Sequence, residues 1–161
     1  PGGVIRVDRC RLAFEHELTL GHYGLPHVQG NAPVVEKISD GEGQGFTASI
    51  PGRQLAFLAY SGWDTVQVKV HSGFNAETEP STVLGAYRKR PTQNPAMELM
   101  ISVMLHKTDD TPWTKDQLSP LKKIELHDVM PSGSVIGATL TLADGSTCVV
   151  DFKDVDGYKA C

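Results

Sequence analysis

Apolar residues recur at every second position in most segments of this chain of 161 residues, and this period of two most constrains what it can fold into. The clearest case lies within residues 96–106, where the alternating apolar residues are Met97, Leu99, Ile101, Val103 and Leu105. Successive side chains of a strand point to opposite faces, so this spacing puts all five on one face. Methionine, leucine and alanine favour a helix by propensity, but the pattern outranks propensity. The segment is therefore predicted to be a strand.

Turn residues separate the alternating segments along the whole length, which contains 16 glycines and 10 prolines. Residues 135–142 and 147–152 predict a hairpin across 143–146, because its Asp-Gly pair accepts the positive φ of tight turns. Residues 54–60 and 65–71 predict a second hairpin, with 61–64 as its loop. Thr114 is the only N-cap signal for a helix, and Pro120 limits that helix to a turn or two.

About eight or nine short strands with at most one short helix predict an all-β fold, an antiparallel β-sandwich or barrel. The absence of strand–helix alternation excludes doubly wound folds and their dinucleotide crevice. No linker or repeat divides the sequence, and 40% of it is hydrophobic, so residues 1–161 are predicted to form a single domain. Because Pro1 stands where Met is expected, we expect the chain to be excised from or processed out of a longer protein.

The formal net charge of −4 opposes nucleic-acid binding, which draws its affinity from clustered Lys and Arg. The one basic cluster is Arg88-Lys89-Arg90, followed by Pro91, and we interpret it as a solvated strand end. An anionic partner or a membrane surface is the alternative for this cluster, although membrane contact is not otherwise indicated. No apolar run approaches the length that spans a bilayer, so no transmembrane segment is predicted and a soluble protein is expected.

Three cysteines, Cys10, Cys148 and Cys161, are an odd number at no metal-ligand spacing. A reducing compartment, the cytoplasm, is the simpler expectation. A secreted protein with one disulfide and one spare thiol remains the alternative, and the disulfide state of the three stays open.

The candidate metal or catalytic site is the group of histidines His16, His22 and His27. Imidazoles near the carboxylates of Glu15 and Glu17 could ligate a transition metal on a β-scaffold. In a strand, however, the two glutamates face away from His16, so only His16 and a loop histidine could share a site. Histidines that lie at the surface or brace a loop are the favoured interpretation, and no cofactor is predicted.

The candidate partner-binding residues are the loop residues Trp63 and Trp113, with Arg88, Lys89 and Arg90 as a polar rim. An exposed indole can anchor a protein partner or a sugar ring. A tryptophan that covers the end of the core is the alternative for each.

Residues 121–128 and 135–142 resemble the late strands of C2 domains: an alternating strand runs into Asp128, and an Ile-Gly pair enters the next strand. Trp113 resembles the tryptophan that precedes these strands in that family. The resemblance implies a β-sandwich that binds membranes or proteins. It does not imply calcium-dependent docking, because the family's calcium sites need several loop aspartates and Met130 stands where a second would follow.

These observations favour a non-catalytic interaction module, which binds a protein partner through a sheet edge or loop surface or self-associates within a larger assembly. One alternative is a metal-dependent or histidine-based enzyme that uses the region of His16, His22 and His27. Another is a module that binds carbohydrate or lipid headgroups through its tryptophans.

Overall fold

The computed structural model describes residues 2–10, 17–29, 31–41, 43–71, 81–89, 98–127 and 135–152. Within these ranges the chain forms eleven strands and no helix, which confirms the all-β prediction. The strands are β1 (Gly2–Cys10), β2 (Glu17–Pro26), β3 (Val34–Asp40), β4 (Gly43–Ile50), β5 (Arg53–Ala59), β6 (Thr65–His71), β7 (Ser81–Lys89), β8 (Glu98–Lys107), β9 (Leu121–His127), β10 (Gly137–Leu142) and β11 (Thr147–Asp151).

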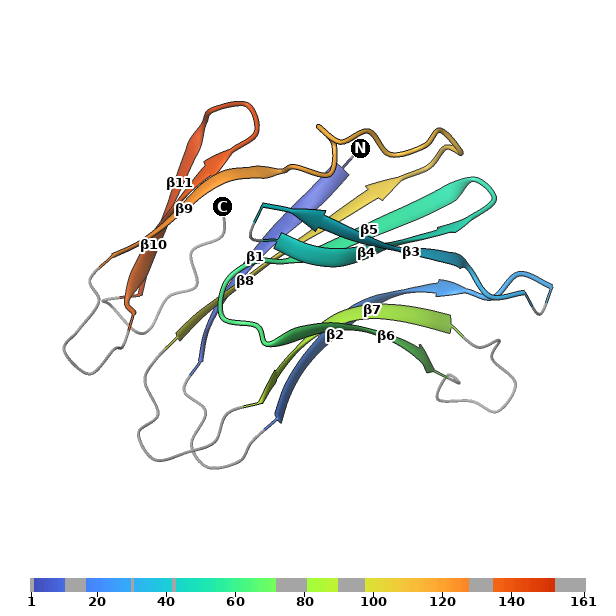
Figure 1. Cartoon of the computed structure of the whole chain (residues 1–161), viewed down its shortest axis with the longest axis horizontal. Coiled ribbons are helices and arrows are strands. Elements are labelled where there is room, and N and C mark those ends of the chain that lie inside the picture. Colours follow the sequence, from blue (N-terminus) through green and yellow to red (C-terminus); the bar gives the residue numbers. More distant parts are fainter. Residues whose placement is uncertain are drawn as a thin grey trace.

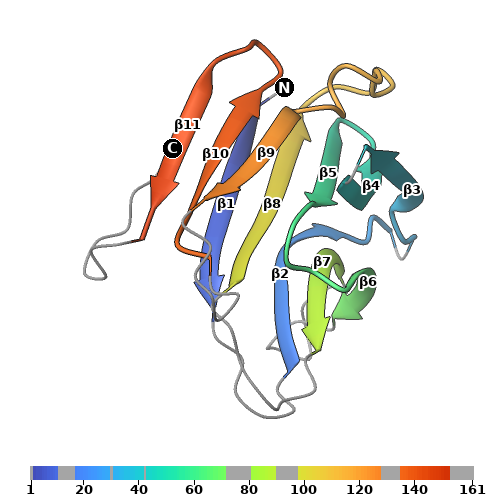
Figure 2. The ribbon, with the colours of Figure 1, turned by 60° about the vertical axis from the view of Figure 1, so that its left-hand side comes forward.

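The strands form three sheets in which every pairing is antiparallel (Figure 1). The central sheet has the order β1-β8-β5-β4-β3, and the outer sheets have the orders β11-β10-β9 and β2-β7-β6. Figure 2 shows β9, β10 and β11 beside β1 and β8, with β2, β7 and β6 below the other end of the central sheet. The fold is thus sandwich-like, with the central sheet shared by two apolar cores.

The first core lies between the central sheet and the β11-β10-β9 sheet. Leu99, Ile101 and Val103 of β8 are buried here against Ala138 and Leu140 of β10. The predicted strand within residues 96–106 is therefore confirmed as β8, and its odd-numbered apolar residues are the ones that pack into this first core.

The second core lies on the opposite face, between the central sheet and the β2-β7-β6 sheet. Phe57 of β5 packs here with Leu84 and Ala86 of β7, and Trp63 covers them. Met104 of β8 also packs against this core, because neighbouring residues of a strand point to opposite faces. The same strand therefore contributes to both cores.

The predicted hairpin across residues 143–146 is confirmed as the β10–β11 hairpin. Asp144 Oδ1 accepts hydrogen bonds from the backbone N–H of Ser146 (2.8 Å) and from its hydroxyl (2.6 Å), while Gly145 adopts a φ of 89°. The Ser146 hydroxyl and then its N–H hold the pKa of Asp144 below its ordinary value. A local turn sequence thus determines this pairing.

The second predicted hairpin, between residues 54–60 and 65–71, is wrong. Both strands form, but β5 pairs with β4 and β8 in the central sheet, whereas β6 pairs with β7 in an outer sheet. The intervening residues 61–64 cross between the two sheets. The backbone N–H of Tyr60 donates to Ile101 O at one end of the crossing, and that of Asp64 donates to Tyr87 O at the other. The apolar residues of β5 and β6 are buried in different sheets. This long-range burial outweighs the tendency of two strands with a short connection to form a hairpin.

The N-cap signal at Thr114 produces a single capped turn rather than a helix. The Thr114 N–H donates to Gln117 Oε1 (3.1 Å), and the Gln117 N–H donates back to Thr114 Oγ1 (3.2 Å). Pro120 follows within one turn, as the sequence predicts. In the part of the chain that the structure describes, no helix is long and apolar enough to cross a membrane.

Candidate functional site

The candidate site is a groove on the face of the central sheet at its β3–β4 end. The connection between β8 and β9 crosses this face and borders an open cavity of about 530 Å³. Val34, Glu36 and Ile38 of β3 line one side, and Trp113 and Leu118 of the connection line the other. We call this cavity the Trp113 groove.

A buried lysine holds the connection in place beside the groove. Lys107 is only 4% exposed, and its ammonium donates to the backbone oxygen of Thr111 and to the hydroxyl of the same residue (3.2 Å). The ammonium also lies 3.7 Å from Asp109 Oδ1 and 4.6 Å from the centroid of the Trp113 ring. A buried charge is tolerated when it is paired and hydrogen-bonded in this way, and a cation over an indole is attractive. Lys107 therefore fixes both the connection and Trp113.

The β4–β5 hairpin provides a second anchor for the same connection. Gln54, which lies opposite Lys107 in the sheet, donates from Nε2 to the backbone oxygens of Asp109 (2.7 Å) and Thr111 (2.8 Å). The Gly52 N–H donates to Asp110 Oδ1 (2.6 Å). These bonds satisfy an irregular backbone that lacks sheet partners, so Trp113 is presented on a rigid support.

Asp109 closes this network at the surface. Hydrogen bonds from the hydroxyl of Thr111 and then from its N–H, followed by the nearby charge of Lys107, hold the pKa of Asp109 below its ordinary value of 3.8. Because the pKa is lowered, the contribution of these bonds to stability is present above 3.8 and is lost only as the pH falls through the lower value. Asp109 is therefore a carboxylate at neutral pH.

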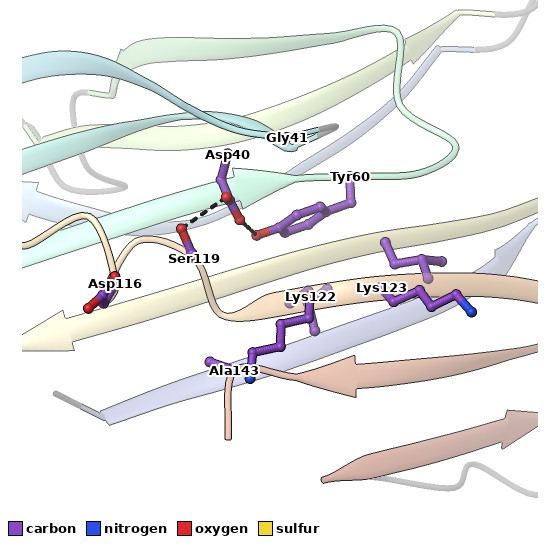
Figure 3. Close-up of a pocket in the computed structure, with 10 residues that line it drawn as sticks. Asp40, Gly41, Tyr60, Asp116, Ser119, Lys122, Lys123 and Ala143 are labelled. Atoms are coloured by element: carbon purple, nitrogen blue, oxygen red, sulfur yellow. Dashed lines mark hydrogen bonds between the residues drawn. The ribbon is translucent and has the colours of Figure 1, made fainter. Parts of the chain in front are cut away.

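A second cavity, of about 650 Å³, lies farther along the same face and is shown in Figure 3. Asp40 is at its centre: the Ser119 hydroxyl donates to Oδ1 (2.9 Å) and the Tyr60 hydroxyl donates to Oδ2 (3.1 Å). Burial and then the charge of Asp40 raise the pKa of Tyr60, so that hydroxyl keeps its proton. Both carboxylate oxygens are thus already engaged, and the group ties the connection to the ends of β3 and β5 rather than offering a free base.

The two tryptophans do not share a site. Trp63 is partly buried and packs against the second core. Trp113 lines the groove on the opposite face of the central sheet, since Val34 of β3 lines the groove while Val35 packs into the second core.

The predicted basic rim lies in another sheet. Arg88 and Lys89 end β7, where their backbones pair with Leu18 and Glu17 of β2. The side chains of these two residues and the whole of Arg90 lie outside the described residues. Their role as a rim stays a prediction, and the β2-β7-β6 sheet that carries them packs on the face opposite the Trp113 groove.

The histidine site stays a prediction as well. His27 is buried, with Nε2 3.1 Å from the hydroxyl of Thr82, which agrees with a histidine that braces a loop. His16 and the side chain of His22 lie outside the described residues. Among the residues that the structure does describe, no group of three His, Cys, Asp or Glu residues is placed to hold a metal ion.

Sequence reasoning missed Lys107, Gln54 and the open edge of β3. One signal for Lys107 was present, because it continues the odd-numbered apolar series of β8 and a charged residue on such a face must be paired inside the protein. Its partners Asp109, Thr111 and Trp113 then follow within six residues, but the contribution of Gln54 depends on the sheet register and has no local signal.

Comparisons with protein-family models, with curated proteins and with solved structures find no match to this chain. The likeness of residues 121–128 and 135–142 to C2 domains therefore stays an expectation. Since one fold can support many functions, the function must be argued from the geometry of the site.

Proposed function

We propose that this chain is a non-catalytic interaction module that binds an extended segment of a protein partner along β3 and in the Trp113 groove. The observation that supports the proposal is an open sheet edge directly beside a groove with a rigidly held aromatic side chain. Main-chain hydrogen bonds to a sheet edge provide affinity in such complexes, and pockets for alternate side chains provide specificity.

The edge is β3, a strand of seven residues at the end of the central sheet. It pairs with β4 and, among the described strands, with no other. Val34, on the groove face of this strand, is 65% exposed. An edge strand directs alternate N–H and C=O groups away from its sheet, and an added strand can pair with them.

The groove supplies the side-chain contacts. Val34, Glu36 and Ile38 face it from β3, so a strand added beside β3 places its alternate side chains on this same face, next to Trp113. Aromatic anchors dominate binding energy at interfaces, and an anchor that is already fixed loses little entropy on binding. The edge strand β1 also borders a groove, of about 360 Å³, but none of the described residues that line it is aromatic.

The peptide Lys-Thr-Leu-Glu-Lys-Thr-Val, titrated against the protein, tests the proposal. The Trp63→Phe variant leaves Trp113 as the only tryptophan, and we expect its fluorescence to change saturably. Trp113→Ala is expected to weaken binding at least about ten-fold in calorimetry. Trp63→Phe is the matched control and keeps the wild-type affinity. Equal affinity of wild type and Trp113→Ala would show that the groove is not the site.

The compartment is a separate proposal. Cys148 on β11 is disulfide-bonded, and disulfides persist in oxidising compartments but are rare in the cytosol. This bond supports the secreted-protein alternative over the cytoplasm. Thiol labelling of the protein in its source cells, without reductant, is expected to leave Cys148 unlabelled. Full labelling of Cys148 in the folded protein would return the expectation to the cytoplasm.

A further inference from the structure

We infer that the β3 edge disfavours pairing with β3 of a second copy of this chain and selects a different protein segment, with an acidic residue opposite Lys37 and a basic residue opposite Glu36. The inference rests on the proposed function and names the class of partner. The charge order along β3 carries it, because Glu36 and Lys37 are both exposed and lie on opposite faces of the strand.

Self-pairing is restricted by geometry. Two folded copies that join β3 to β3 in an antiparallel pair are related by a two-fold axis perpendicular to the sheet. A rotation about this axis does not exchange the two faces of the joined sheet, so the groove faces of both copies lie on the same side of it. Residues directly opposite each other point to the same face, so only residues of the same parity, both even or both odd, come opposite each other.

Every extended register that satisfies this condition opposes like charges. With Lys37 on the axis, the two lysines face each other, and with Glu36 on the axis the two glutamates do. With Ile38 on the axis, Glu36 of each copy lies opposite Asp40 of the other, so two pairs of like charges form. In every other register that satisfies the condition, the two copies of β3 overlap over at most three of their seven residues. Like charges directly opposite each other destabilise a pair of strands, so this edge opposes a homodimer that joins β3 to β3.

A segment from another protein escapes this restriction. It brings no second copy of β3, so it can place an acidic residue opposite Lys37 and a basic one opposite Glu36. The described charged residues that line the Trp113 groove are Glu36 and Asp110, both acidic. A basic side chain on the groove face of the partner therefore complements the charge of the groove, and an apolar neighbour beside Ile38 reaches the groove itself.

Four peptides that differ only in their fourth and fifth residues test the partner class. They are Lys-Thr-Leu-Glu-Lys-Thr-Val and versions with Glu-Glu, Lys-Lys or Thr-Thr at these two positions. We expect the Glu-Lys peptide to bind about five-fold more tightly than the Glu-Glu and Lys-Lys peptides, because only it pairs both charges favourably. The difference should disappear in about 1 M NaCl, where screening is nearly complete.

The self-association of charge variants tests the second half of the inference. We expect Glu36→Thr/Lys37→Thr to dimerise at least about five-fold more tightly than wild type in sedimentation, because the opposed charges are gone. Lys115→Thr/Asp116→Thr removes the same two charges from the exposed turn of the β8–β9 connection and serves as the matched control. Unchanged association of the β3 variant would overturn the self-exclusion.

The outcomes of the two tests separate the inference from the proposed function. Equal binding of all four peptides would leave the proposed function in place and overturn the charge selection. Failure of all four to bind would overturn both the proposed function and the partner class. The self-association of the charge variants is measured without any peptide. It therefore tests whether the charges of β3 oppose a β3–β3 homodimer, whether or not the peptides bind.

Discussion

Gly62→Ala is expected to lower the free energy of unfolding by about 3 kcal/mol or more. Gly62 lies in the crossing between the central and outer sheets at a φ of 81°, which L residues rarely adopt. A Cβ at this position would also collide with the backbone oxygen of Leu99 and lie 2.7 Å from Met100 Cγ. Since β8 contributes to both cores, the strand cannot shift cheaply to make room.

Gly52→Ala is the matched control for this substitution. Gly52 has a similar φ of 73°, but a Cβ there meets nothing within 4 Å. Only the conformational strain remains, so the expected loss is about 1 kcal/mol. Urea denaturation of the two variants gives the comparison. Equal losses would mean that the crossing is not tightly packed against β8.

Leu140→Ala is expected to cost about 3 kcal/mol, because Leu140 is fully buried in the first core. In a Trp113→Phe background, Trp63 is the only tryptophan and reports on the second core. The two cores share β8. We therefore expect Leu140→Ala to lower the unfolding midpoint that Trp63 fluorescence reports, although Leu140 and Trp63 lie on opposite sides of the central sheet. Val149→Ala, at an exposed position of the same outer sheet, should change stability by less than about 0.5 kcal/mol.

An unchanged Trp63 midpoint in Leu140→Ala would contradict this expectation. The β11-β10-β9 sheet would then unfold separately from the rest of the chain. The experiment thus also tests the prediction that residues 1–161 form one domain, since a single domain unfolds as one cooperative unit.

Local patterns predicted most strands because each depends on a few neighbouring residues. The alternation in β8 outranked the helix propensity of its methionines and leucines, since burying one face offsets a weak local preference. Local patterns do not say which sheet a strand joins: β1 pairs with β8, whereas β2 pairs with β7 in another sheet. The predicted eight or nine strands are also fewer than the eleven observed among the described residues.

The candidate site was predicted only in part. Trp113 was identified because an indole in a loop stands out in a sequence. That Trp63 and Trp113 lie on opposite faces of the central sheet was not predictable, because the faces they occupy depend on which sheets pack on each side. The anchors Lys107 and Gln54 are far apart in sequence and meet only through the register of β5 with β8.

The sequence alone determined that the chain is all-β, where most strands lie and how the β10–β11 turn closes, because period-two patterning and turn chemistry act over a few residues. The tertiary structure alone decided which strands pair, that β5 and β6 belong to different sheets, and that β3 remains an edge beside Trp113. Those outcomes depend on how apolar faces distant in sequence are buried against each other, and the alternation along any one strand is the same for every partner it could have.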